Sequence, residues 1–498
     1  MNFGQWKPER VEKAAGVLLF LAIIYFPVFL HLSSFSLCMW DESLYALRAL
    51  EISHNGEYLF NFNQFSELSD HPNTKPPLIT LIQALFLKLG GYNVLSLRFP
   101  VAVFVLLTVL IIIQFCKKEL QISLAGYFGG LVLLCSTGYI SLHIARTGDH
   151  DAPLAFFTTL TLLNFYRFLK HEKKKSVYLL FSTLSLIAAT FTKTVAGLMF
   201  IPSLLIYAIF TKKIRYIISS PAFYLCAMLY FTVTGTYFLL MEHLSPGYFS
   251  AVWDNDMGGR YSGTIDQHLH PFFFYFNNLV ESRFIPWIFV LPLSGFLIFR
   301  SQNSELKRFS VFAGVGIVGY WLIISLARTK LLWYDAPLFP LMSTLVAIGI
   351  FLIYNHFISL EMFRSRYNRI IFLLLFIFAV YYSPYMTVIK SVYHYENNWR
   401  DEQLGDFMKK ISPDIKQYTI LLKNWNSHAV FYKEAYNING YNITIKRFED
   451  TFTSGEILMT CNSLDWSRKR FTYVVLDKYK DCRLIRINEL TGKKENTN

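Results

Sequence analysis

The sequence predicts an all-α polytopic membrane protein with a small α/β domain at its C-terminal end. The first observation is composition, because the 498 residues are 53% hydrophobic and only 16% charged, too apolar for soluble domains of this total length. The second is that apolar stretches of about 17–24 residues recur over the first part of the chain, each long enough to cross a bilayer. The third is that basic residues gather in short segments between those stretches.

The basic segments set the predicted orientation. Lys and Arg are enriched in short cytoplasmic loops, so we place every basic segment inside. This arrangement gives about eleven crossings and a cytoplasmic N-terminus. The predicted spans are 15–37, 96–115, 121–141, 152–169, 177–192, 194–210, 216–240, 284–299, 309–327, 332–355 and 370–390. Membrane orientation also accounts for the formal net charge of +13, so nucleic acid is not an expected partner.

Four segments lie on the outer side in this topology, namely 38–95, 142–151, 241–283 and 391–498. We therefore divide the chain into a transmembrane domain, 1–390, and an extracytoplasmic domain, 391–498. The tail alternates β-rich runs (YTILLK, TYVVLD, CRLIRI) with charged helical stretches such as DEQLGDFMKK, as in a small α/β domain. Cys461 and Cys482 can form a disulfide there, whereas the other four cysteines are expected to be buried apolar side chains.

The first outer loop begins with two carboxylates, Asp41 and Glu42. The next residues, 43–51, place leucines at helical spacing, which predicts an interfacial helix with its apolar side toward the membrane. Asp41 can cap that helix or take part in chemistry, and the pattern alone does not choose. Further on, Lys75 precedes two prolines that hold the backbone extended. Its ammonium can bind a lipid phosphate or simply reach the headgroups.

The second outer segment reads ARTGDHDAP and offers a candidate metal site. In an extended stretch, Asp149 and Asp151 point the same way and can ligate one hard cation, although Asp151 can equally cap the next helix. His150 lies between them, and His268 in the loop 241–283 is a further candidate ligand. A divalent cation is the only cofactor for which the sequence gives an indication.

Ionisable residues gather at the outer ends of the spans, and almost none lies in the middle of one. A proton-coupled transporter usually carries such groups near the bilayer midplane. An enzyme that acts on a lipid-anchored substrate needs them at the outer surface, where the head of the lipid lies. The distribution therefore favours a membrane enzyme, with a transporter or flippase of a lipid-linked sugar as the alternative.

Taken in order, these motifs resemble the GT-C class of integral-membrane glycosyltransferases, in the branch of the protein O-mannosyltransferases and the lipid A aminoarabinose transferases. The matching pieces are DESLYALRAL after the first span, KPPL followed by GGYN and RFP, R-x4-D-x-P at 146–153, a lysine-containing turn around Lys193, and K-x3-Y-x2-P at 330–337. The resemblance implies a GT-C fold and a polyprenyl-phosphate sugar donor that is used on the outer face.

The resemblance also implies roles for individual residues. The implied catalytic residues are Asp41, Glu42 and Asp151. The implied ligands of the donor phosphate are Lys75, Arg260, Lys330 and Tyr334. Arg146 and Lys193 stand in the matched motifs as supporting residues. Asp149 and Arg328, which the resemblance does not assign, are added as supporting residues from their places in the sequence. Asp41 would take the proton of an attacking hydroxyl, and two roles stay open for Glu42, support of the helix or a contact to the acceptor.

The implied reaction is a single displacement, which inverts the anomeric centre. The acceptor can be a lipid A-like glycolipid, a glycan or a protein hydroxyl, and no feature of the sequence chooses among them. The expected location is the bacterial cytoplasmic membrane, with the active site and the C-terminal domain in the periplasm.

Overall fold

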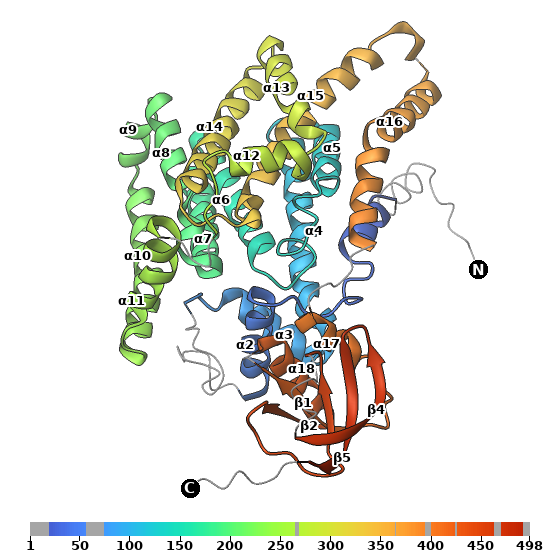
Figure 1. Ribbon diagram of the computed structural model, residues 1–498. Helices are drawn as coiled ribbons and strands as arrows, with labels where there is room; N and C mark the ends of the chain where they lie inside the picture. Colours follow the sequence, from blue (N-terminus) through green and yellow to red (C-terminus); the bar gives the residue numbers. More distant parts are fainter. Residues whose placement is uncertain are drawn as a thin grey trace, which may run out of the picture.

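The computed structural model describes residues 19–55, 74–263, 268–363, 365–393, 400–423, 426–462 and 470–491. Helices build the larger part of the molecule, and a five-stranded sheet lies at one end (Figure 1). The predicted fold class is confirmed, since the chain is mostly helical with several candidate membrane spans and a small mixed-sheet domain.

The helices follow one another with short breaks. After a first helix, Leu19–Val28, they are α2 Asp41–Asn55, α3 Leu78–Gly90, α4 Val94–Lys118, α5 Ser123–Leu134, α6 Asp151–Lys170, α7 Lys175–Lys193, η1 Thr194–Leu198, α8 Ile201–Phe210, α9 Ile214–Ile218, α10 Pro221–Leu244, α11 Tyr248–Val252, η2 Trp253–Ser262, α12 Phe274–Asn278, η3 Leu279–Arg283, α13 Trp287–Arg300, α14 Ser304–Leu326, η4 Leu332–Leu338, α15 Phe339–Ile358, η5 Glu361–Phe363 and α16 Arg366–Tyr393.

Each predicted span overlaps a helix. Within the described ranges, six helical segments are long and apolar enough to cross a membrane, namely α4, α7 with η1, α10, α14, η4 with α15, and α16. A seventh results if the pair Phe274–Arg283 and Trp287–Arg300, bent by 103°, counts as one span. The other predicted crossings fall on α6 and on shorter apolar helices, so the number eleven stays a prediction.

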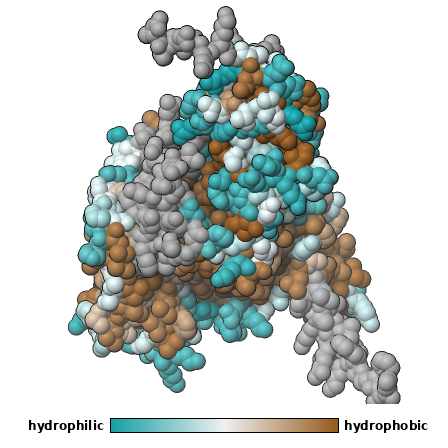
Figure 2. Space-filling model, turned by 90° about the horizontal axis from the view of Figure 1, so that it is seen from below, coloured by the Kyte–Doolittle hydropathy of each residue, from teal (hydrophilic) through white to brown (hydrophobic). Residues whose placement is uncertain are grey.

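The outermost helices expose apolar side chains. In α10 and α16, only 11% and 6% of the apolar window is buried, and Phe231 and Phe378 are 70% and 60% exposed. Figure 2, which views the molecule from below, shows broad hydrophobic patches at the lower left and right and hydrophilic residues mainly above them. A surface of this extent is stable against lipid rather than water, so the chain is an integral membrane protein.

The C-terminal domain is a mixed sheet with two helices, α17 Arg400–Met408 and α18 Ser427–Ile438. The strands are β1 Gln417–Leu422, β2 Asn442–Arg447, β3 Ile457–Thr460, β4 Phe471–Tyr479 and β5 Cys482–Leu490. Their order is β2-β1-β3-β5-β4, with β1 parallel to both neighbours and β5 antiparallel to both of its own. All three predicted β-rich runs are strands, and Cys461 and Cys482, whose pairing the sequence left open, form a disulfide. The other four cysteines are buried, as expected.

Helix α2 confirms the helix predicted after the acidic pair, but its apolar side packs within the protein. Leu47 and Leu50 are only 1% and 3% exposed. They belong to a core that they share with α3, α17 and α18 rather than facing a membrane. The expectation that these leucines face lipid is therefore corrected, because the C-terminal domain covers them. This contact brings the C-terminal domain next to the acidic pair.

Candidate active site

A cavity of about 430 Å³ lies among α6, η1, η2, α14 and η4. Most of its wall is apolar, with Leu154, Val195, Leu198, Met199, Pro202, Ile323 and Ile324 among the lining residues. Its charged and hydroxyl-bearing lining residues include Lys75, Asp151, Lys193, Thr194, Asp256, Arg260, Thr329 and Tyr334. The site thus combines a wall suited to a hydrocarbon chain with a group of cations.

Lys75 reaches this cavity from the start of α3. Pro76 and Pro77 hold the chain before the helix, which begins at the following residue. The Lys75 ammonium lies 2.5 Å from Oδ1 of Asp256 in η2, and the other oxygen of Asp256 accepts a hydrogen bond from the Thr194 hydroxyl. Burial lowers the pKa of Lys75, and Asp256 offsets part of that effect. Asp256 therefore joins three elements around the cavity.

Arg260, Lys193 and Asp151 complete the charged group, and Tyr334 lies among them. Arg260 donates a hydrogen bond to the hydroxyl of Tyr334. The Lys193 ammonium lies 5.4 Å from the centre of the Tyr334 ring. Lys193 also donates to both carboxylate oxygens of Asp151, at 2.8 and 2.7 Å. Lys193 ends α7, so this contact ties α7 to the start of α6 and fixes the ammonium at the cavity.

Asp41 is the first residue of α2. Its carboxylate makes no hydrogen bond or ion pair with any residue that the structure describes, so the capping role is not observed. Burial by itself raises the pKa of Asp41, but the surrounding cations outweigh it and leave the pKa below its ordinary value. These cations are Lys193, Arg260, His143 and Lys75. Three of the four line the cavity or its rim, so Asp41 is an ionised carboxylate beside the cationic group.

His143 supplies the fourth charge near Asp41. Its Nδ1 lies 3.4 Å from the Asp149 carboxylate, and its ring stacks on Trp333 with 4.0 Å between ring centres. Burial lowers the pKa of His143, but Asp149 more than compensates and raises it to about 9. The imidazole is therefore protonated at neutral pH.

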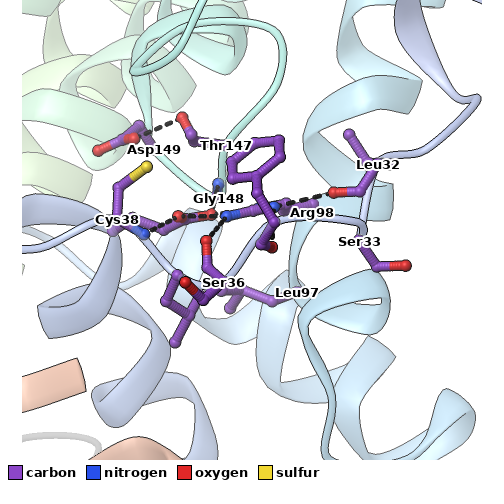
Figure 3. A network of polar contacts seen from close by, with 12 residues as sticks. Leu32, Ser33, Ser36, Cys38, Leu97, Arg98, Thr147, Gly148 and Asp149 are labelled. Atoms are coloured by element: carbon purple, nitrogen blue, oxygen red, sulfur yellow. Dashed lines mark hydrogen bonds and ion pairs between the residues drawn. The ribbon is translucent and has the colours of Figure 1, made fainter. Parts of the chain in front are cut away.

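Glu42 differs from Asp41, because its carboxylate is fully used within the protein. It accepts hydrogen bonds from Nε and Nη2 of Arg98, at 2.6 and 2.8 Å. It also accepts from the backbone N–H groups of Cys38 and Gly148, at 2.7 and 2.6 Å. Figure 3 shows Arg98 in the middle of this network. These bonds favour the supporting role of Glu42 over the catalytic role that the resemblance implied.

The residues of the segment 142–151 do not converge on a metal. Arg146 donates to carbonyls at the end of the first helix, those of Pro27, Val28 and Leu30. Asp149 accepts from the Thr147 hydroxyl, and His150 stacks on Tyr45.

The predicted metal set of Asp149, His150, Asp151 and His268 is thus not brought together. Asp151 is paired with Lys193, and His268 lies on another loop, where its carbonyl accepts from the backbone N–H of Lys330. Across the described ranges, no group of three or more His, Cys, Asp or Glu residues is placed to hold a metal ion.

Lys330, expected to bind the donor phosphate, and Arg328, expected to support the site, do not line the cavity. The ammonium of Lys330 donates to the carbonyl of Ala327, at 2.5 Å, and Lys330 is not part of the cavity wall. Arg328 is exposed. Thr329, which lies between them, lines the cavity instead. The motif K-x3-Y-x2-P therefore places Tyr334 in the cavity wall, but it does not place Lys330 there.

Comparisons with known proteins agree with this architecture. Residues 74–238 match the family model of dolichyl-phosphate-mannose-protein mannosyltransferases. ArnT from Cupriavidus metallidurans, solved with undecaprenyl phosphate, superposes with a TM-score of 0.69 over 95% of this chain and 98% of ArnT, at 15% identity. The chain has the GT-C fold. AglB from Archaeoglobus fulgidus, an oligosaccharyltransferase solved with an inhibitory peptide and a dolichol-phosphate, superposes with a TM-score of 0.54 over 86% of this chain and 64% of AglB, at 13% identity.

An uncharacterized protein of Aquifex aeolicus is 26% identical over 339 residues, which is 68% of this chain. The match spans 64% of the length of that relative. The GT-C resemblance drawn from the sequence motifs is thus confirmed by the family model and by the structural matches.

Within this GT-C framework, sequence reasoning found part of the site and missed part. Asp256 and Thr194 were not singled out, although Asp256 lies in the polar run WDNDMGGR of the segment 241–283. Arg98 belongs to the RFP motif that carried the resemblance. A buried arginine in a predicted span was the available signal, because such a charge needs a partner.

Proposed function

We propose that this protein transfers a sugar from a polyprenyl-phosphate donor to an acceptor at the outer face of the membrane. The observation that carries the proposal is the apolar cavity with Lys75, Lys193 and Arg260 in its wall and Asp41 beside them. An apolar wall suits a prenyl chain, and a cluster of cations suits a phosphate. The carboxylate supplies a proton acceptor next to that phosphate.

The proposed reaction is a single displacement. An acceptor hydroxyl oxygen attacks the anomeric carbon while Asp41 takes the hydroxyl proton. The bond from the anomeric carbon to the phosphate oxygen breaks, and its electron pair leaves with polyprenyl phosphate. Lys75 and Arg260 stabilise the growing negative charge. Attack opposite the leaving group inverts the anomeric centre.

The cations near Asp41 link donor binding to proton transfer in this mechanism. Without a bound anion, their charge keeps the pKa of Asp41 low, which makes it a weak base. A phosphate placed among the same cations neutralises much of their field, so the pKa of Asp41 rises. The carboxylate therefore becomes a better base once the donor is in place.

Asp151 acts on the ammonium of Lys193 rather than on the reacting atoms in this scheme. Its two hydrogen bonds hold Lys193 at the cavity.

We place the site on the periplasmic side of a bacterial cytoplasmic membrane. The acceptor would be a lipid A-like glycolipid, a glycan or a protein hydroxyl. The undecaprenyl phosphate of ArnT and the dolichol-phosphate and peptide of AglB support this kind of donor and acceptor.

The test is a turnover assay on the purified protein in detergent, with a polyprenyl-phosphate sugar and a membrane extract as acceptor. Transfer releases free polyprenyl phosphate and labels the acceptor with inverted stereochemistry. A flippase would instead move the donor across proteoliposomes without consuming it. Movement without consumption would reject the transferase.

Replacing Lys75 by alanine is expected to weaken the binding of polyprenyl phosphate by roughly 10–100-fold, since a charge-assisted hydrogen bond contributes about 1.5–3 kcal/mol. Replacing Lys330 by alanine should have little effect, because its ammonium bonds a backbone carbonyl outside the cavity wall. Affinities measured by titration of the detergent-solubilised protein compare the two. Equal losses would show that Lys330 reaches the phosphate.

A further inference from the structure

We propose that the C-terminal domain positions the catalytic carboxylate by fixing the backbone directly before it. Its positioning residues are Glu402, His428 and Tyr432, which we call the C-terminal clamp. The inference rests on the proposed role of Asp41 as the base and assigns the C-terminal domain a part in the reaction. None of the three side chains lines the cavity.

The clamp binds two residues, Leu37 and Met39, of the segment that leads into α2. The hydroxyl of Tyr432 accepts a hydrogen bond from the N–H of Leu37, at 3.2 Å. The carboxylate of Glu402 accepts from the N–H of Met39, at 2.8 Å. Glu42 accepts from the N–H of Cys38 between them. Every backbone N–H from 37 to 39 is therefore held by a side chain, two of them from the C-terminal domain.

His428 holds the same segment from its carbonyl side. Its Nδ1 lies 2.8 Å from the carbonyl oxygen of Leu37, and its Nε2 accepts from the N–H of Gly405, at 3.1 Å. A carbonyl can only accept, so the ring proton is on Nδ1 and the imidazole is neutral. Gly405 permits this contact, because a Cβ there would lie 2.7 Å from Nε2 and 2.4 Å from the Tyr432 ring.

Packing and two hydroxyls reinforce these bonds. The side chain of Leu37 is fully buried in the core that contains Leu404 and Phe407 of α17. The Ser36 hydroxyl donates to the carbonyl of Glu402, at 2.6 Å. The hydroxyls of Ser43 in α2 and Ser427 in α18 are 2.5 Å apart. The segment is thus fixed on both sides of Asp41.

The clamped segment is followed by an unfavourable backbone conformation. Trp40, the residue between the clamped segment and Asp41, has a φ of 70°. A bulky side chain in this left-handed region is disfavoured and persists only where the surroundings determine the backbone. The bonds to Leu37, Cys38 and Met39 lie directly before it. Releasing them frees the turn and moves Asp41 relative to the cationic group.

The experiment compares Glu402→Ala, Glu402→Gln and Tyr432→Phe in the full-length protein, with Glu449→Ala as control. Glu449 is an exposed carboxylate of the same domain. We expect Glu402→Ala to lower kcat roughly tenfold to hundredfold, the range for a reacting group displaced by about 1 Å. Affinity for polyprenyl phosphate should be retained. Glu402→Gln should keep most of the activity, because its amide oxygen can still accept from Met39.

Cys38 gives a readout that does not depend on turnover. It lies within the clamped segment and is 3% exposed. Alkylation by a small maleimide, followed by mass spectrometry of the peptide, should be faster in Glu402→Ala and Tyr432→Phe than in Glu449→Ala, at equal melting temperature. Unchanged labelling of Cys38 in both variants would overturn the clamp. So would a wild-type kcat in both Glu402→Ala and Tyr432→Phe. Faster labelling in a protein without transferase activity supports the clamp and rejects the proposed function.

Discussion

Replacing Asp41 by asparagine is expected to lower transfer by about 10²–10⁴-fold, the usual contribution of a general base. The amide keeps the shape of the side chain but cannot take the hydroxyl proton. Binding of polyprenyl phosphate should be as tight or tighter, because the substitution removes a negative charge that competes with the phosphate for the same cations.

The control for this substitution is Asp254→Asn. Asp254 is an exposed carboxylate of η2 that is bonded to Ser250 and does not line the cavity. Donor turnover and affinity for polyprenyl phosphate are measured on both variants. Near-wild-type turnover in the Asp41 variant would show that Asp41 is not the base. A large loss of turnover in Asp254→Asn would instead point to general damage to the protein.

Replacing Arg98 by methionine is expected to destabilise the protein by about 3–5 kcal/mol, since it leaves the Glu42 carboxylate buried without its counter-ion. Both side chains are fully buried. Arg98 also donates to the carbonyls of Leu32, Phe35 and Ser36, which would lose their donors. The melting temperature in detergent should fall strongly.

Two further variants test whether the loss of stability comes from the buried charge of Glu42. Arg308→Met removes a charge from a pair with Glu305 whose side chains are 52% and 32% exposed, so about 0–1 kcal/mol is expected. Adding Glu42→Gln to Arg98→Met should restore part of the stability, because the buried charge is gone. A double variant no more stable than the single one would show that the carboxylate charge is not the cause.

The fold class could be predicted from the sequence because it depends on local patterns. Apolar stretches locate helices, and alternation in the tail locates strands, without knowledge of what packs on what. The helix at the acidic pair followed in the same way. The environment of its apolar side could not be predicted in this way, because Leu47 and Leu50 pack against α17 and α18, which are distant in the sequence.

The site could be predicted only in part, for a similar reason. Lys75 stands in a recognisable motif and Arg260 in a polar loop, and the fold brings both to one cavity. Lys330 stands in an equally recognisable motif, yet its ammonium turns to the carbonyl of Ala327. A motif gives the residue type and the place in the chain but not the direction of a long, flexible side chain. The partners of Glu42 come from three separate segments and follow only from tertiary structure.

The contacts of the C-terminal clamp also bear on how the protein is made. They join residues 363 to 395 positions apart, so the turn before α2 is completed by a domain that is synthesised much later. During translation, Asp41 is synthesised long before Glu402 and Tyr432. A nascent or prematurely terminated chain would carry the cations and the cavity without a fixed base. Under the proposed function, this order of synthesis would keep an unfinished chain from consuming the lipid-linked sugar.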